Sequence, residues 1–358
     1  MKNQSAHEPA LDGVRGLAVL AVLVFHALPT TLSGGFLGVD IFFALSGYLI
    51  TGLLLAEFDA TQRLNIPQFF VRRWFRLAPA LLAMLLVYGL VVWLFVPLAS
   101  LKKQGVDIVV ALLYLTNWAR VISLNAETDL GHTWSLAVEA QFYLVWPFLM
   151  WVLLRCVGKR THLLLAMVAL AALSWAVRLV LTAQGVDVSR TYNGLDTRAE
   201  TLMWGAAFAV LGSLKSAPQV NPSRQIWNLA AAVCLGVIVL LIAQAQWTSI
   251  LYYNYGITLV AVSSALLVFY LHRIDESWVK RLFEQTWLVW VGSISYGLYL
   301  WHFPIYRLLT GLGLDRWALL GAGFGLTVVV ASVSYYGMER PLMNWRKSRK
   351  LRMPVNVT

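Results

Sequence analysis

Charge is scarce in this sequence, because only 13% of its 358 residues are Asp, Glu, Lys or Arg while 59% are hydrophobic. A water-soluble domain carries about 25% charged residues. The composition therefore excludes a water-soluble protein. Cysteine is scarce as well, and both Cys156 and Cys234 lie in or beside hydrophobic stretches. Two such residues are too few for a disulfide framework or a cysteine metal site, and we expect no metal.

Several catalytic signatures are missing from the sequence. It has no Walker loop, no dinucleotide fingerprint, no HExxH zinc motif and no GxSxG elbow around Ser46. ATP-driven pumping and hydrolysis by a serine triad therefore have little support. The net charge of +11 does not indicate nucleic-acid binding either, because the basic residues form no continuous stripe with interleaved aromatic residues.

Hydrophobic stretches long enough to cross a bilayer are present along the whole chain, separated by short loops. They predict an all-α fold, a polytopic transmembrane helical bundle of about ten spans. The stretch 101–120 is apolar but short between polar ends, so we expect it to lie at the interface or to re-enter the membrane. The spans are predicted near 14–29, 36–57, 77–97, 133–156, 162–182, 199–214, 225–246, 250–271, 286–306 and 314–337.

Basic residues gather in alternate loops, and this pattern predicts the orientation because Lys and Arg accumulate on the cytoplasmic side. The basic segments lie around 63–76, 155–160, 273–281 and 346–352. Placing them inside puts both termini in the cytoplasm. We expect residues 1–345 to form a single membrane domain and 346–358 to form a basic cytoplasmic tail near anionic lipid headgroups.

The first hydrophobic stretch, LDGVRGLAVLAVLVFHALP at 11–29, contains three ionisable residues. Arg15 and His26 are eleven residues apart, so they share one helix face at a separation of about 16 Å along the axis. Asp12 precedes Arg15 by one turn. Such a line is costly in a membrane unless it faces a polar cavity or a ligand. Asp12 and Arg15 either anchor the helix end or form part of a site, whereas for His26 we favour a general base over a simple interhelical hydrogen bond.

A second polar line lies in GHTWSLAVEAQFYLVWP at 131–147, where His132, Ser135, Glu139 and Tyr143 share one helix face. A carboxylate such as Glu139 needs a partner inside a membrane. It could orient a histidine, bind a substrate hydroxyl or pair with an arginine such as Arg15 to hold two helices together.

Three arginines stand close together in FFVRRWFRLAP at 69–79. Arg72, Arg73 and Arg76 are suited to forked contacts with the phosphates of an anionic cytosolic ligand, although topology alone also explains basic residues here.

Further polar residues lie near predicted span ends. Asp196 and Arg198 could recognise a sugar or polyol, or they could belong to a solvated loop. His302 precedes Pro304, and it is a minor candidate for a site because a packed, hydrogen-bonded histidine is the commoner case.

Seven ordered segments together resemble the acyltransferase family 3 of integral-membrane O-acyltransferases, which includes bacterial O-antigen and exopolysaccharide acetylases. The resemblance covers about residues 10 to 342. The segments are LDGVRGLAVLAVLVFH, GVDIFFALSGYLITGLLL, FFVRRWFRLAP, HTWSLAVEAQFYLVWP, LDTRAETLMWG, SYGLYLWHFP and MERP.

This resemblance implies a function in the bacterial cytoplasmic (inner) membrane. It implies transfer of an acyl group, commonly acetyl, from cytosolic acyl-CoA to a hydroxyl of a carbohydrate or glycolipid such as O-antigen or exopolysaccharide. His26 would act as the base or carry the acyl group transiently. Many relatives append a soluble esterase-like domain, and since this sequence ends soon after Arg352 we expect any such partner to be a separate soluble protein or to be unnecessary.

The candidate residues fall into three predicted sets, and the resemblance supports Arg15, His26, Glu139 and the cluster of Arg72, Arg73 and Arg76 among them. The catalytic set is His26, Asp12 and Glu139. The acyl-CoA-binding set is Arg15, Arg72, Arg73 and Arg76, and the substrate-binding set is His132, Ser135, Asp196, Arg198 and His302.

Two alternatives remain open. The acceptor could instead be a small secondary metabolite or a lipid. The protein could also be a transporter in which His26, Glu139 and His302 form a proton relay, although the sequence lacks the paired broken helices of such folds.

Overall fold

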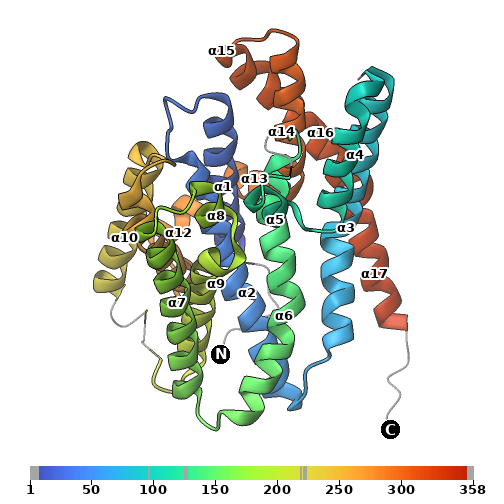
Figure 1. Cartoon of the computed structure of the whole chain (residues 1–358). Coiled ribbons are helices and arrows are strands. Elements are labelled where there is room, and N and C mark those ends of the chain that lie inside the picture. The colour runs from blue at the N-terminus through green and yellow to red at the C-terminus, as the bar shows by residue number, and fades with distance from the viewer. Residues whose placement is uncertain (1–7, 96, 125–127, 218–219, 221–223, 353–358) are drawn as a thin grey trace.

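The computed structural model describes residues 8–95, 97–124, 128–217, 220 and 224–352, and this part of the chain contains helices and no strands (Figure 1). It confirms the all-α prediction. The helices are α1 Pro9–Ala27, α2 Gly38–Thr61, α3 Ile66–Phe95, α4 Leu98–Leu112, α5 Thr116–Val121, α6 Trp134–Cys156, α7 Arg160–Ala183, α8 Val188–Asn193, α9 Leu195–Ser213, α10 Arg224–Gln244, α11 Ile257–Arg273, α12 Trp278–Phe283, α13 Thr286–Ser293, α14 Ser295–Gly311, α15 Arg316–Ala318, α16 Phe324–Ser334 and α17 Arg340–Arg352.

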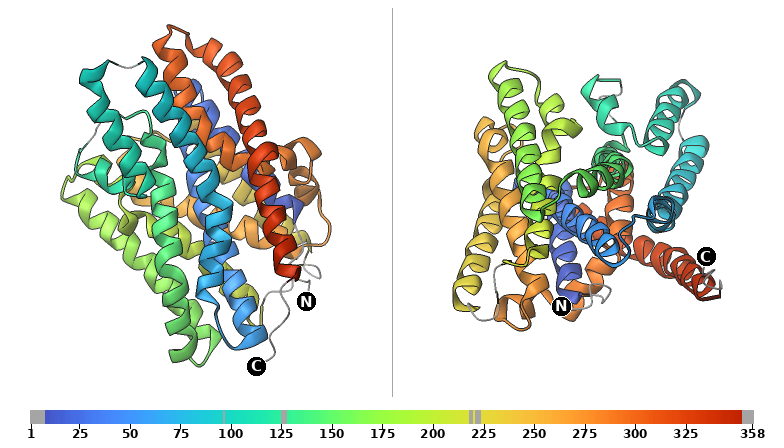
Figure 2. Two further views of the ribbon diagram at one scale, coloured as in Figure 1. Left: turned by 90° about the vertical axis from the view of Figure 1, so that its right-hand side faces the viewer. Right: turned by 90° about the horizontal axis from the view of Figure 1, so that it is seen from below.

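Within the described ranges, eight helical segments are long and apolar enough to cross a membrane. Two further predicted spans, α9 and α14, are not among these eight. The first turns of α9 carry several charged side chains, and α14 has only 17 residues. α1 begins and α17 ends at the lower side of the bundle (Figures 1 and 2). The eight segments are Pro9–Ala27, Gly35–Thr61, Ile66–Phe95, Gly131–Cys156, Arg160–Ala183, Arg224–Gln244, Tyr252–Arg273 and Arg316–Arg346.

The structure differs from the predicted boundaries in two places, and it shows two short helices in the stretch 101–120. The predicted span 286–306 is divided at Ile294 into α13 and α14. Beside this break, α13 crosses α1 so closely that Gly292 meets the backbone carbonyl of Asp12 with no room for a side chain. The stretch 101–120 forms α4 and α5, and the 15 residues of α4 extend about 22 Å, less than the ~30 Å hydrocarbon core. The last helical run continues to Arg352, into the predicted tail, of which residues 353–358 lie outside the described ranges.

Small residues allow α2 and α9 to pack closely. Gly47 lies against the carbonyl of Leu202, and Gly205 lies against the carbonyl of Ala44, so any side chain at either glycine would collide with backbone. In a membrane, where helices are not driven together by exclusion of water, such close van der Waals packing is a main source of association. The α2–α9 pair therefore forms a rigid centre for the bundle.

α1 lies inside the bundle, in contact with α2, α11, α12, α13 and α14. Two-thirds of its hydrophobic window (67%) is buried in protein, compared with 17% for the peripheral helix α10. The ionisable side chains of α1 are consequently placed among other helices rather than in lipid, as their cost in hydrocarbon requires.

Candidate functional site

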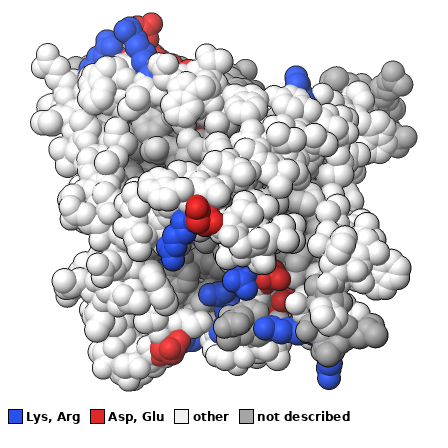
Figure 3. Space-filling view, turned by 90° about the horizontal axis from the view of Figure 1, so that it is seen from above, with Lys and Arg blue, Asp and Glu red and all other residues white. Residues whose placement is uncertain are grey.

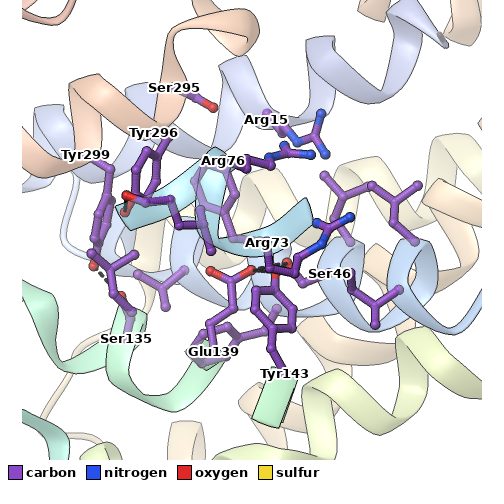
Figure 4. A pocket seen from close by; sticks show the side chains of 18 residues that line it. Arg15, Ser46, Arg73, Arg76, Ser135, Glu139, Tyr143, Ser295, Tyr296 and Tyr299 are labelled. Carbon is purple, nitrogen blue, oxygen red and sulfur yellow. Dashed lines mark hydrogen bonds between the residues drawn. The ribbon is translucent and has the colours of Figure 1, made fainter. Parts of the chain in front are cut away.

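A narrow cavity lies at the N-terminal end of α1, and we call it the arginine cavity. Its volume is about 90 Å³. Figure 4 shows Arg15, Arg73 and Arg76 converging on it from α1 and α3, with Glu139 and Tyr143 opposite them on α6. The sequence predicted an anionic ligand for these arginines, and the structure brings three of the four together.

The guanidinium of Arg73 lies over two aromatic rings. It lies 5.8 Å from the ring centroids of both Phe69 and Tyr143. Its Nε is buried and has no hydrogen-bond partner in the described part of the chain. Arg15, by contrast, donates to Asp12 at 2.5 Å. A buried donor without a partner is costly, so the cavity offers Arg73 to an anionic or polar ligand.

Arg72 does not line the arginine cavity, although the sequence predicted one ligand site for it and its neighbours. Its side chain points to α2, where Nη2 donates to Glu57 at 3.2 Å, and about a third of it (35%) is exposed. Adjacent residues of a helix point about 100° apart. Arg73 and Arg72 therefore cannot both face one narrow cavity.

Glu139 accepts hydrogen bonds from Ser46 and Tyr143, and it lines the arginine cavity (Figure 4). The sequence had suggested a histidine or Arg15 as the partner of Glu139, and neither donates one of these hydrogen bonds. The structure thus places this carboxylate with the arginines of α3 and at a distance from His26.

A larger cavity lies at the other end of α1, and we call it the histidine chamber. Its volume is about 620 Å³, which lies within the range of ligand-binding pockets. His26 and His132 line it together with aromatic and polar side chains. Burial raises the pKa of Tyr192 to about 12, so its phenol stays neutral and can donate a hydrogen bond. The other lining residues are Val22, Phe25, Phe36, Val39, Arg120, Ser123, Gly131, Trp134, Asp187, Val188, Ser189, Asn193, Trp247, Thr248, Tyr299 and Phe303.

Three histidines from three different elements meet beside this chamber. The ring centroid of His302 lies 4.9 Å from that of His26 and 5.4 Å from that of His132. His302 is fully buried, and its Nε2 lies 3.2 Å from Nδ1 of His26. His302 had been a minor candidate for substrate binding, yet it contacts His26 and is not among the residues that line the chamber.

Proline explains how His132 is held. Pro304 lacks an N–H, so the carbonyl of Leu300, four residues earlier in α14, loses its helical donor. His132 Nε2 lies 3.1 Å from that carbonyl oxygen and donates to it. The other ring nitrogen, Nδ1, is buried and has no partner among the described residues.

Neither carboxylate predicted to support catalysis lies at His26. Asp12 is held by Arg15 in the first turn of α1, whereas His26 is in the last turn of the same helix. Glu139 belongs to the arginine cavity. From another helix, His302 contacts the His26 ring nitrogen, and because it is 276 positions away in the chain, spacing within one helix could not have indicated it.

Asp196 and Arg198, which the sequence predicted to bind substrate, are engaged in ion pairs and line neither cavity. Arg198 is fully buried and donates to Asp40 on α2 at 2.8 Å. Asp196 accepts two hydrogen bonds from Arg190, at 2.8 and 2.5 Å. Both pairs serve to tie elements together.

Tyr299 lines both cavities, as does Val39. The Tyr299 hydroxyl donates to the backbone carbonyl of His132 at 2.9 Å and lies 2.6 Å from Ser135 Oγ. Ser135 itself lines only the arginine cavity. Tyr299 could not be singled out from the sequence, where it is one aromatic residue among many, because its place between the cavities depends on how α6 and α14 pack.

The sequence was compared with protein families and with known proteins. Residues 8–336 match the profile of an acyltransferase domain. No solved structure matches the chain.

Three relatives show how far the similarity extends. The chain is 34% identical over 347 residues to peptidoglycan O-acetyltransferase OatA of Listeria monocytogenes, covering 93% of this chain and 55% of that protein. It is 32% identical over 377 residues to a putative O-acetyltransferase of Staphylococcus aureus (98% and 61%), and 34% over 349 residues to the putative peptidoglycan O-acetyltransferase YrhL of Bacillus subtilis (93% and 54%). The chain thus spans a little over half the length of these relatives.

Proposed function

The chain belongs to the acyltransferase family, and from this premise we propose that it is a membrane O-acetyltransferase. It moves an acetyl group from acyl-CoA to a hydroxyl of a cell-envelope carbohydrate. One observation carries the proposal. A cavity lined with cations and a chamber containing His26 lie at opposite ends of α1 and share the lining residues Val39 and Tyr299.

The arginine cavity is the proposed donor site. Guanidinium groups make forked, charge-assisted hydrogen bonds to phosphates. Arg73 lines this cavity, and its buried Nε has no hydrogen-bond partner in the described part of the chain. A volume of about 90 Å³ admits a thin chain but not a nucleotide. We therefore propose that the thioester arm enters the cavity while the phosphates of acyl-CoA stay at its mouth.

His26 is the proposed general base. The acceptor hydroxyl gives its proton to Nε2 of His26 as the hydroxyl oxygen bonds to the acyl carbon. The carbon–sulfur bond then breaks, and the departing thiolate takes a proton from the imidazolium. For this the acyl carbon has to pass from the arginine cavity to the chamber, beside Val39 and Tyr299.

The histidine chamber is the proposed acceptor site. Its walls combine aromatic faces, such as those of Trp134 and Trp247, with hydroxyl and amide groups from Ser189, Asn193 and Thr248. A sugar ring needs this combination, since it has apolar faces and a rim of hydroxyls. Relatives named as peptidoglycan O-acetyltransferases support a cell-envelope glycan, and peptidoglycan is the first acceptor to test, before O-antigen and exopolysaccharide.

We also propose a topology of ten crossings, made by the eight long segments together with α9 and α14, with both termini in the cytoplasm of a bacterium. Two observations support it. The first residues of α1 and the last residues of α17 lie on the same side of the bundle (Figure 1). The opposite face carries basic and acidic side chains mixed together (Figure 3), whereas the loops around 63–76 and 155–160 are basic. The arginine cavity then opens toward cytosolic acyl-CoA.

The test is acetyl transfer by the purified protein in proteoliposomes, from radiolabelled acetyl-CoA to peptidoglycan fragments and, in parallel, to lipopolysaccharide and exopolysaccharide. We expect transfer to one glycan, its loss in His26→Ala, and retained CoA binding in that variant. His162→Ala is the matched control, because His162 is an exposed histidine of α7. Substantial turnover by His26→Ala at normal abundance would overturn the role of His26, and transfer only to lipids or small molecules would overturn the acceptor class.

A further inference from the structure

We propose that His302 is a positioning residue that fixes the tautomer of His26, so that Nε2 of His26 presents a lone pair to the histidine chamber. The inference rests on the proposed function, in which His26 Nε2 takes the proton of the acceptor hydroxyl. The hydrogen-bond partners show first which ring nitrogen of His302 carries the proton, and then which ring nitrogen of His26 does.

The first step concerns His302. Its Nδ1 lies 2.7 Å from the carbonyl oxygen of Tyr299 and 3.2 Å from that of Leu298. A carbonyl only accepts hydrogen bonds, so Nδ1 carries the proton. The ring is fully buried, and no described carboxylate forms an ion pair with it. It is therefore neutral, and its Nε2 has a lone pair that can only accept.

The second step passes this assignment to His26. Its Nδ1 lies 3.2 Å from Nε2 of His302 and 3.0 Å from the carbonyl of Val22. Both neighbours are acceptors, so Nδ1 of His26 carries the proton and donates it. In a neutral imidazole the other nitrogen is then unprotonated, which leaves Nε2 of His26 as the basic atom.

The two acceptors of His26 are not equivalent. The Val22 carbonyl lies in the same helix, four residues before His26, and already receives the helical hydrogen bond along the axis. His302 comes from α14, and its Nε2 has no other hydrogen bond among those of the described residues. When His26 takes up a proton at Nε2, the resulting charge strengthens the donation from Nδ1 to His302. His302 thus takes the place that a carboxylate holds in a serine-protease triad.

His132 does not share this role, although its ring is also close. Its Nε2 donates to the Leu300 carbonyl, and no hydrogen bond joins it to His26 among the described residues. Substitution of His302 consequently removes the tertiary acceptor of His26 and leaves the hydrogen bond of His132 in place.

Two substitutions separate positioning from packing. His302→Leu keeps a buried apolar side chain but removes the acceptor. His302→Gln keeps an acceptor, because the amide oxygen of Gln takes a place close to that of Nε2. We expect His302→Leu to lose kcat by about 100-fold or more, toward the ~10⁴-fold cost of a wrong histidine tautomer in a serine protease, with KM for both substrates unchanged. His302→Gln should retain kcat within about tenfold, since a comparable hydrogen bond to His26 remains.

The matched control is Tyr306→Phe, one turn further along α14. Tyr306 packs its ring 5.9 Å from that of His302, and its hydroxyl has no partner among the described residues. This variant should keep normal kcat and thermal stability. Near-normal kcat in His302→Leu, or equal losses in the Leu and Gln variants, would overturn the positioning role.

A measurement without turnover completes the test. Nitrogen-15 NMR of histidine-labelled protein in bilayers, with the resonance assigned by His26→Gln, distinguishes a protonated Nδ1 from a protonated Nε2. We expect protonated Nδ1 in the parent and in His302→Gln, and a shift toward protonated Nε2 in His302→Leu. A parent His26 protonated at Nε2 would overturn the inference even if acyl transfer is observed. Absence of acyl transfer in the parent would instead refute the proposed function and leave the tautomer result standing.

Discussion

The neighbouring residues Arg72 and Arg73 allow a sharp test of the donor site. Both were predicted from sequence to bind acyl-CoA, but only Arg73 lines the arginine cavity. Arg72 lies outside it and pairs with Glu57. Replacing each arginine with Ala removes the same charge from the same turn of α3. Any difference in donor binding between the two variants therefore comes from contacts in the cavity and not from the loss of positive charge.

The contacts of the two arginines determine how much CoA affinity each variant is expected to lose. A hydrogen bond to a charged group contributes about 1.5–3 kcal/mol, and each ~1.4 kcal/mol corresponds to tenfold in affinity. One such bond lost in Arg73→Ala therefore predicts roughly 10- to 150-fold weaker CoA binding. Arg72 lies outside the cavity, so Arg72→Ala removes only a partly exposed charge near the ligand. Such a charge contributes about 0–1 kcal/mol to an ion pair, so the affinity should change by about fivefold at most.

The assay is calorimetric titration of CoA and acetyl-CoA into the purified parent and variants, with protein abundance and thermal stability recorded for each. Arg73→Lys should fall between parent and Ala, because lysine retains the charge but lacks the guanidinium fork. Equal losses in Arg72→Ala and Arg73→Ala, or unchanged affinity in Arg73→Ala, would refute the assignment of the cavity to the donor.

Three further predictions concern other parts of the molecule. Arg198→Met should destabilise the fold by about 3–5 kcal/mol, since it leaves Asp40 buried without its ion-pair partner. The double variant with Asp40→Asn should recover much of this loss in thermal unfolding, and a double variant no more stable than Arg198→Met would contradict the prediction. Pro304→Ala restores a backbone N–H that competes with His132 for the Leu300 carbonyl, so KM for the acceptor should rise several-fold at unchanged CoA affinity. An unaltered KM would count against this competition for the carbonyl. Tyr192→Phe should raise KM for the acceptor about tenfold through the loss of one hydrogen bond in the chamber, whereas a change confined to the donor would disprove this placement.

The sequence alone was sufficient for those features that depend on neighbouring residues in one helix. Composition and hydrophobic length predicted a helical membrane protein, because the bilayer requires long apolar helices whatever their arrangement. The spacing of Asp12 and Arg15 predicted that they lie one turn apart, and the structure shows them as an ion pair. The same spacing placed Arg15 and His26 along α1, at the two ends where the cavities lie.

Tertiary structure decided which of these groups face one another. Arg72 and Arg73 are equivalent in sequence, and only the packing of α3 against α2 and α6 gives one to Glu57 and the other to the arginine cavity. His302 reaches His26 because α14 lies beside α1. Such contacts arise where helices far apart in the chain cross, and the crossing depends on the shapes of all the side chains between them, so helical periodicity, which is local, contains no record of them.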